Sequence, residues 1–236
     1  MIIKTKAIVI SSLKYQEKSL IVKCFTESDG LKSYFVPNAF SGNKNKTKAV
    51  FFQPLTQLEI IASHRNKGSL EHFREIKVNY LYQTIPINII KSSIVIFLAE
   101  VLHSAIREEE KNTALFEYLE TSLQWLDTHH QVSDFHLSTL IGITRYLGFY
   151  PAKEQDTEPY FEMINGVFSS NPGINTLNEK ESQLLKKLLK LKRNQEPAFL
   201  VSERQLLLKI IMDYYTLHLD GFRRPKSVEI LKEVFE

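Results

Sequence analysis

The stretch SGNKNKTKAVFFQP, residues 41–54, carries the residue types that most directly suggest chemistry. Lys44, Lys46 and Lys48 alternate with small polar residues, and two phenylalanines follow. Closely spaced ammonium groups attract phosphates and release their counterions, and exposed rings stack on unpaired bases. The stretch therefore predicts either a phosphate-binding loop beside an aromatic platform or a solvated hairpin ahead of a core strand.

Further basic residues accompany the strands expected around this loop. Lys4 and Lys6 are two positions apart in the first expected strand, so they share one of its faces. Lys32 follows the first hairpin turn, and Arg65 and Lys67 flank a later turn. In a small barrel these cations are expected to gather in one groove and bind DNA or RNA. Nearby rings are expected either in the core or as stacking surfaces: Tyr34, Phe35, Phe40, Phe51 and Phe52.

A second basic cluster lies near the other end of the sequence. Arg223, Arg224 and Lys226 follow an expected helix end at Gly221. Cations near a helix C-terminus are stabilised by the helix dipole whatever their function. The cluster therefore has two open interpretations, a helix-end charge pattern or a ligand site.

No residues assemble a catalytic or metal-binding motif. Dinucleotide, P-loop, zinc-protease and serine-hydrolase patterns are all missing from the sequence. His129, His130 and His136 lie near a helix junction, but adjacent histidines point in different directions and no thiol or carboxylate completes a ligand set. They are expected to be surface and capping residues, and the run Glu108–Glu110 is typical of a solvated helix end. We expect no enzymatic activity, no metal and no cofactor.

The charge is distributed unevenly along the 236 residues, although the net charge is only +3. Residues 1–80 hold 13 Lys and Arg against 6 Asp and Glu, a net of +7, and residues 81–236 hold 17 against 21, a net of −4. A basic first part favours a localised polyanion-binding surface.

The single cysteine, Cys24, excludes an intramolecular disulfide. Without a signal-peptide pattern or an apolar run of ~18 residues, the protein is expected in the cytoplasm, associated with the nucleoid when engaged on DNA, and not in a membrane.

The residues that position this chemistry fall into two kinds of segment. Alternating apolar residues and turns, such as Asp29-Gly30 between two apolar runs, predict five strands within residues 1–80. A small, closed or nearly closed antiparallel barrel buries such strands without exposed edges. From Pro86 the apolar residues recur at helical spacing. Asn178 with Glu181, and Ser202 with Gln205, are expected capping boxes of two later helices. The expected fold is α+β, with a barrel over 1–80 and an all-helical domain over 81–236 that is interrupted by an irregular loop at 152–177. Within this loop, YFEMINGVFSS (160–170) is a candidate for a short hairpin.

Several segments, in chain order, resemble the RecO family of recombination-mediator proteins. YQEKSLIVKCFTESDGLKSYFVPNA (15–39), the basic loop and QPLTQLEI (53–60) are similar to the family's N-terminal domain. FLAEVLHSAI (97–106), RYLGFYP (145–151) and LHLDGFRRPKSVEIL (217–231) are similar to parts of its helical domain. The resemblance implies an oligonucleotide/oligosaccharide-binding (OB) barrel followed by a helical domain, which agrees with the layout expected from periodicity.

The resemblance also implies a function. Members of the family bind single- and double-stranded DNA, anneal strands coated with single-strand-binding protein and, with the partner RecR, help to load a RecA-type recombinase. The resemblance also implies that Lys32 and the loop lysines contact DNA. Arg145 and the Arg223–Lys226 cluster become candidates for the site that takes the acidic tail of single-strand-binding protein. The alternatives are an OB-fold module that binds a protein partner without touching DNA, and a metal-dependent nuclease.

One feature of the family is missing from this sequence. Many members carry a four-cysteine zinc motif after the segment that matches 145–151. The corresponding residues here, AKEQDTEPYFEMINGVFSSNPG, contain no cysteine, so no zinc is expected. The loop is expected to be held by packing of residues such as Tyr160, Phe161, Met163 and Phe168.

Overall fold

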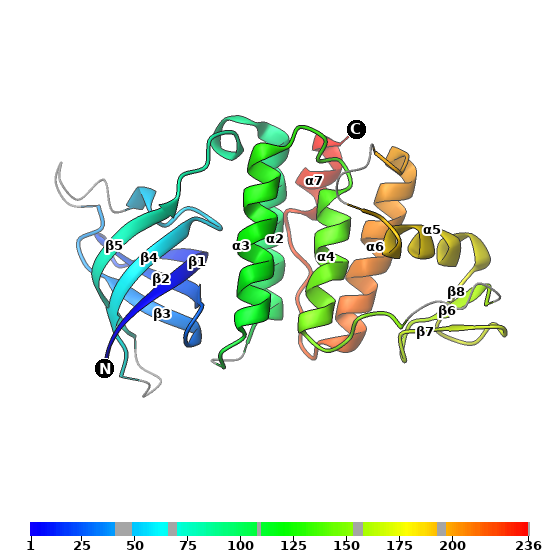
Figure 1. Ribbon diagram of the computed structural model, residues 1–236, viewed down its shortest axis with the longest axis horizontal. Coiled ribbons are helices and arrows are strands. Elements are labelled where there is room, and N and C mark those ends of the chain that lie inside the picture. The colour runs from blue at the N-terminus through cyan, green and yellow to red at the C-terminus, as the bar shows by residue number, and fades with distance from the viewer. Residues whose placement is uncertain (41–48, 66–69, 108–109, 153–157, 193–196, 236) are drawn as a thin grey trace. The chain divides into compact units, whose positions relative to one another are not determined.

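A five-stranded antiparallel sheet forms the first part of the fold (Figure 1). The computed structural model describes residues 1–40, 49–65, 70–107, 110–152, 158–192 and 197–235. The strands are β1 (Ile2–Tyr15), β2 (Ser19–Thr26), β3 (Gly30–Val36), β4 (Gln57–Ser63) and β5 (His72–Tyr80). Their order in the sheet is β3-β2-β1-β4-β5. The long strand β1 pairs with β4 along its first half and with β2 along its second, so it holds the two halves of the sheet together.

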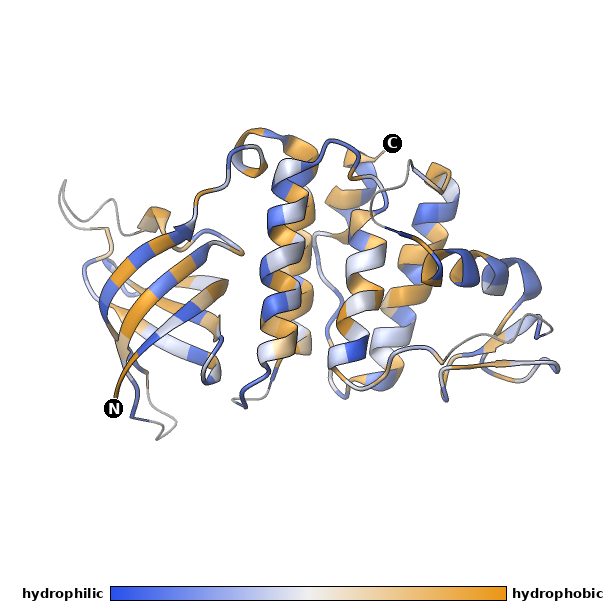
Figure 2. Cartoon of the chain, viewed as in Figure 1, coloured by the Kyte–Doolittle hydropathy of each residue, from blue (hydrophilic) through white to orange (hydrophobic). Residues whose placement is uncertain are grey.

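The core of this part lies on one face of the strands, as the alternation of residue types predicts. Hydrophobic and hydrophilic residues alternate along β4 and β5 (Figure 2). The inward side chains of all five strands meet in one cluster, which includes Val9, Val22, Tyr34 and Ile60. Burying such side chains stabilises the fold by ~1.5–3 kcal/mol each. We call this side of the strands the inner face and the opposite side the outer face.

Of the closed or nearly closed barrel that was expected, the closed form is not shown. Among the described residues, one isolated bridge joins Tyr34 of β3 to Glu71, the residue directly before β5. Two backbone hydrogen bonds make this bridge, from Phe35 N–H to Glu71 O at 2.9 Å and from Glu71 N–H to Ser33 O at 2.8 Å. The two edge strands of the sheet therefore meet at one point without forming a continuous ladder there.

Helices α2 (Ile89–Ala105) and α3 (Thr113–Thr128) pack with the sheet in one compact unit, residues 1–128. Phe25, on the outer face of β2, contacts Phe116 of α3 with ring centroids 6.0 Å apart. Glu120 of α3 accepts two hydrogen bonds from the strands, from Lys6 Nζ to its carboxylate at 3.0 Å and from Gln57 Nε2 to its backbone carbonyl at 3.1 Å. These contacts cover one end of the outer face of the sheet.

A buried carboxylate ties the connection after β5 to the end of α3. Asp127 accepts hydrogen bonds from the backbone N–H groups of Gln83, Thr84 and Ile85 at 2.8–3.1 Å. Burial alone raises the pKa of Asp127, but these hydrogen bonds outweigh it and hold the pKa below its ordinary value. The short 3-10 turn η1 (Ile85–Ile87) that leads into α2 is thereby fixed to α3. The boundary expected near residue 80 stays a prediction, and the compact units divide the chain after Thr128.

Residues 129–236 form the second compact unit, which is not purely helical. It contains helices α4 (Phe135–Tyr146), α5 (Glu179–Leu189), α6 (Val201–His218) and α7 (Val228–Val234). The expected all-helical domain is confirmed only in part, because Tyr160–Glu162 (β6), Val167–Ser169 (β7) and Thr176–Leu177 (β8) pair in a three-stranded sheet, and β6 and β7 form the hairpin expected at residues 160–170. Its hairpin turns at Gly166, where φ is +67°. This sheet lies within the segment expected to be a loop with a short hairpin.

Packing holds this small sheet against the helices of its unit. Phe161 and Phe168 face each other with centroids 4.9 Å apart, and Phe161 also meets Tyr214 of α6 at 5.8 Å. The backbone N–H of Phe161 donates to Ser182 Oγ of α5 at 2.9 Å. None of the helices in the described ranges is long and apolar enough to cross a membrane.

Candidate nucleic-acid interface

Apolar and aromatic side chains line the part of the outer face that α2 and α3 leave open. The register pairs Leu13 of β1 with Ile21 of β2, and Ile21 with Phe35 of β3. Cross-strand partners point to the same face of a sheet, and Tyr15 follows Leu13 by two positions. Leu13, Tyr15, Ile21 and Phe35 therefore form one stripe across three strands, on the opposite side from the core.

Three rings of this region stand edge to face. Tyr15 and Phe35 lie at a centroid distance of 6.2 Å with their planes at 86°, and Phe35 and His72 lie at 6.1 Å with their planes at 89°. Tyr15 is 42% exposed, His72 of β5 is exposed and Phe35 is half-buried. We call Tyr15, Phe35 and His72 the ring strip. Edge-to-face rings leave part of each aromatic face free, so a flat base can stack on them.

A cation and a further ring lie where the lysine loop begins. Lys14 Nζ is 6.0 Å from the centre of the Phe40 ring, and both residues are exposed. The backbone N–H of Phe40 reaches the carbonyl of Lys18 at 3.4 Å. Phe40 directly precedes the stretch that holds Lys44, Lys46 and Lys48, which lie outside the described residues, as does Lys67.

Lys4 and Lys6 share a face of β1, as the alternation predicts, but both are paired with carboxylates. Lys4 Nζ is 3.2 Å from Glu59 Oε2, and Lys6 Nζ is 3.0 Å from Glu120 Oε1. The hydrogen bond with Glu120 raises the pKa of Lys6. Their charge is offset by these acids, so the two lysines offer less to a polyanion than their number suggests.

Lys32 and Arg65 lie in different environments. Lys32 is only 7% exposed, because the register places it opposite the fully buried Cys24 on the inner face. Burial argues against a contact between Lys32 and DNA. Arg65 is exposed, and its backbone N–H donates to both carboxylate oxygens of Glu71 at 2.9 Å. The described residues therefore do not bring the expected cations together into one groove.

The rings proposed as stacking surfaces divide between the core and the surface. Phe52 is 1% exposed and stacks on Phe73, Tyr34 is fully buried, and Phe51 packs partly buried against the same core. Phe35 and Phe40 remain accessible. The sequence interpretation missed Tyr15, His72 and Lys14, although the alternation at the end of β1 places Leu13 and Tyr15 on one face.

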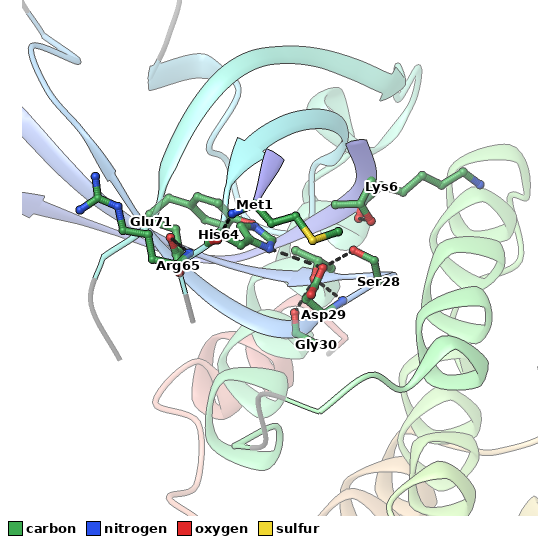
Figure 3. A network of polar contacts seen from close by, with 11 residues as sticks. Met1, Lys6, Ser28, Asp29, Gly30, His64, Arg65 and Glu71 are labelled. Atoms are coloured by element: carbon green, nitrogen blue, oxygen red, sulfur yellow. Dashed lines mark hydrogen bonds and ion pairs between the residues drawn. The ribbon is translucent and has the colours of Figure 1, made fainter. Parts of the chain in front are cut away.

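A buried polar network fixes the strand that carries Phe35 (Figure 3). Tyr34, the neighbour of Phe35, stacks on Phe73 at 4.1 Å and its hydroxyl lies 2.7 Å from His64 Nε2. His64 Nδ1 is 3.4 Å from Asp29 Oδ2, in the turn between β2 and β3. Burial raises the pKa of Tyr34 far above its ordinary value, so the phenol stays neutral. With Tyr34 held inside, Phe35 is held outside.

The candidate cations of the second unit are spread over different contacts. The Arg145 guanidinium lies 4.4 Å from the centre of the Tyr150 ring. Arg224 forms an ion pair with Asp213 of α6. Arg223 and Lys226 are exposed. Arg145 and Arg224 therefore have different partners.

The part of the chain that the structure describes holds no group of three or more His, Cys, Asp or Glu able to bind a metal ion. His136, expected at the surface, is 2% exposed. Glu108 and Glu109 of the acidic run lie outside the described residues.

Two family models and several proteins of similar length match this chain. A family model described as recombination protein O N terminal matches residues 1–82, and one described as recombination protein O C terminal matches residues 88–227. Proteins called DNA repair protein RecO are similar throughout. The one from Flavobacterium psychrophilum is 57% identical over 235 residues, 99% of each chain. The one from Flavobacterium johnsoniae is 58% identical over 234 residues, again 99% of each. The one from Christiangramia forsetii is 44% identical over 246 residues and all of both chains.

Proposed function

Because the chain belongs to the RecO family of DNA repair proteins, we propose that it is a recombination mediator that binds single- and double-stranded DNA. In this proposal residues 1–80 are an OB-type module, and the outer face of strands β1, β2 and β3 meets the nucleic acid. The observation that carries the proposal is the ring strip, a partly exposed aromatic surface on the opposite side of the sheet from the core. Solvating such a surface is unfavourable unless a partner covers it.

Stacking and charge have separate roles in this proposal. Unpaired bases stack on Tyr15, Phe35 and His72, which favours single strands without reading their sequence, because every base has an aromatic face. Phosphates are bound by the loop lysines Lys44, Lys46 and Lys48, and the exposed Lys14 and Arg65 are further cations that could contact them. Lysine contacts with phosphates carry no base information. A duplex, whose bases are already stacked, then binds mainly through its phosphates.

The second unit has the role of an anchor. It binds the acidic, hydrophobic tail of single-strand-binding protein, so that the protein accumulates on coated strands. Two coated strands held by such anchors meet at a raised effective concentration, which promotes their annealing. Together with RecR, the protein then assists the loading of a RecA-type recombinase.

An annealing and gel-shift experiment tests this function. Labelled complementary oligonucleotides are coated with single-strand-binding protein, and duplex formation is followed with and without the protein and with and without Mg²⁺ or Mn²⁺. We expect faster annealing and retarded DNA that stays intact in both conditions. Binding no stronger than that of an unrelated protein of similar charge supports a protein-interaction module, and metal-dependent degradation of the label supports a nuclease.

A further inference from the structure

The carboxylate of Glu120 in α3 binds the ammonium of Lys6 in β1 with both of its oxygens. Lys6 Nζ lies 3.0 Å from Oε1 and 3.0 Å from Oε2. Asn79 Nδ2, near the end of β5, donates a further hydrogen bond to Oε1 at 3.2 Å. The Glu120 side chain is 12% exposed, and the Lys6 side chain is 40% exposed. The carboxylate is therefore held in one position, and it occupies the ammonium where that group meets solvent.

A second carboxylate, Glu59 of β4, stands among three lysines of the same face. The register sets Glu59 directly opposite Lys6 of β1 and directly opposite Lys77 of β5. Lys4 Nζ reaches Glu59 Oε2 at 3.2 Å. Ala7, the neighbour of Lys6, points into the core, so Lys6 and its cross-strand partners lie on the outer face. We call the following five residues the paired end of the outer face: Lys4, Lys6, Lys77, Glu59 and Glu120.

Further acids surround Lys6 and reinforce this pairing. The hydrogen bond with Glu120 is the largest cause of the raised pKa of Lys6. The charges of Glu27 and Glu117 raise that pKa further, although burial opposes them. Glu117 is exposed and lies one turn before Glu120 in α3. A phosphate that approaches Lys6 therefore meets fixed carboxylates as well as an ammonium group.

The paired end and the ring strip lie on the same face of the sheet, at different ends of β1. Tyr15 follows Lys6 by nine positions, which is ~30 Å along the strand at ~3.3 Å per residue. Between them α3 meets the sheet, where Phe116 packs on Phe25. At ~3.4 Å per stacked nucleotide, about 16 nucleotides span this distance and about 4 do not. A long single strand that stacks on the ring strip and continues along β1 therefore reaches α3 and Glu120.

We propose that Glu120 and Glu59 are resident counter-ions which occupy the place of phosphates at the paired end, so that a bound single strand stops at α3. The inference rests on the proposed function, because it needs an outer face that binds nucleic acid, and it adds the limit of that binding site. Each carboxylate holds a lysine that would otherwise contribute a phosphate contact. The two acids thereby confine the nucleic acid to the ring strip and the cations near it.

Oligothymidines of two lengths test this limit. The probes have about 4 and about 16 nucleotides, the two ends of the range that OB folds bind. Glu120→Gln keeps the shape of the side chain and removes its charge, so Lys6 becomes available to a phosphate. The affinity for the long probe is expected to rise about fivefold at about 0.1 M salt, because one further phosphate contact adds ~0.7 to the slope of log affinity against log salt. The affinity for the short probe is expected to stay unchanged.

Two further variants locate the gain in affinity. Glu117→Gln removes the same charge from the neighbouring turn of α3 without releasing Lys6, and it is expected to change the affinity for the long probe less than about twofold. Lys6→Gln in the Glu120→Gln background is expected to abolish the gain, because the released ammonium is gone. Equal affinities of the wild type and Glu120→Gln for the long probe would overturn the proposal, and so would an equal gain on both probes.

The ion pair also joins α3 to the sheet, and a purely structural role gives a different result. Loss of that role lowers the midpoint of urea unfolding without changing how affinity depends on probe length. If Glu120→Gln does not fold, Glu59→Gln releases Lys4 instead and is expected to raise the affinity for the long probe alone. An unchanged affinity in that variant contradicts the proposal. A wild-type protein that binds neither probe contradicts the proposed function itself, and the inference falls with it.

Discussion

The Tyr15 ring meets the Phe35 ring edge to face, 6.2 Å between centroids, on the side of the sheet that faces away from its core. The two residues come from strands that are not neighbours, since β2 lies between β1 and β3. Their contact spans β2 over Ile21, and it continues through Phe35 to His72. The result is an ordered aromatic surface that the hydrophobic core does not need.

Removing one ring of the strip is expected to weaken single-strand binding. Phe35→Ala should reduce the affinity for an oligothymidine by ~1–3 kcal/mol, roughly 5- to 150-fold, because a base loses its stacking partner. Fluorescence anisotropy at several salt concentrations measures the effect, and the slope of log affinity against log salt should stay unchanged. Leu13→Ala, which removes an exposed aliphatic side chain on the same face, is the control and should have a much smaller effect. Equal losses in the two variants would indicate a general apolar contact instead of stacking.

Neutralising the loop lysines is expected to change the salt dependence. Replacing Lys44, Lys46 and Lys48 together by glutamine should weaken binding and lower the slope for single strands by about 2, since each phosphate contact contributes ~0.7. The double variant Lys4→Gln/Lys6→Gln is the matched control, because both lysines already pair with carboxylates. It should change the slope less. An unchanged slope in the triple variant would rule out the loop as the phosphate contact.

The buried phenol of Tyr34 is expected to be structural. Tyr34→Phe removes the hydroxyl next to His64 Nε2 and leaves that nitrogen buried without a partner, so unfolding in urea should become easier by ~1–3 kcal/mol. Circular dichroism measures the urea concentration at which half of the protein is unfolded. Tyr160→Phe is the comparison, because the Tyr160 hydroxyl bonds Glu179 on the surface and its loss should be nearly neutral. A stability equal to that of the wild type in Tyr34→Phe would show that the network in Figure 3 contributes little.

His136 is expected to make stability depend on pH. Its pKa is about 3 in the folded protein against 6.5 as its ordinary value, so the unfolded chain binds a proton that the folded chain does not. Above pH 6.5 the imidazole is neutral in both the folded and the unfolded chain, so burying it does not change how the free energy of unfolding depends on pH. Stability falls as pH drops from about 6.5 towards 3, by at most ~1.4 kcal/mol per pH unit from this group. Urea unfolding of the wild type and of His136→Gln, measured between pH 7 and pH 5, gives the slope of the free energy of unfolding against pH for each protein. Parallel slopes in the two proteins would contradict a depressed pKa.

The features that sequence predicted well are those that local residue patterns determine. Alternation placed Lys4 and Lys6 on one face of β1, and Asn178 with Glu181 forms the expected capping box, with both hydrogen bonds at 3.0 Å. The cap expected at Ser202 was wrong, because α6 begins at Val201 and Glu203 accepts the backbone N–H of Leu200 instead. Leu200 has no side-chain oxygen of the kind that the capping pattern requires, so the pattern favoured Ser202, two positions later.

The features that sequence did not predict depend on residues far apart in the chain. Lys32 is buried because β3 pairs with β2 in the register that sets it opposite Cys24. Phe35 and His72 are 37 positions apart in the sequence, and their contact exists because β3 and β5 meet at the Tyr34–Glu71 bridge. The contacts of α3 likewise join residues forty or more positions apart, because Glu120 bonds to strand residues and Asp127 bonds to the connection after β5. Hydrophobic periodicity carries no information on such pairings.

Photo-crosslinking tests the base-stacking claim most directly. An oligothymidine carrying one 5-iodouracil is irradiated in complex with the wild-type protein, and the linked peptides are identified by mass spectrometry. Because this base couples to aromatic side chains on which it stacks, links are expected at Tyr15, Phe35 or His72, and they should disappear at Phe35 in Phe35→Ala. Efficient crosslinking confined to other residues, with none in the ring strip, would contradict the account.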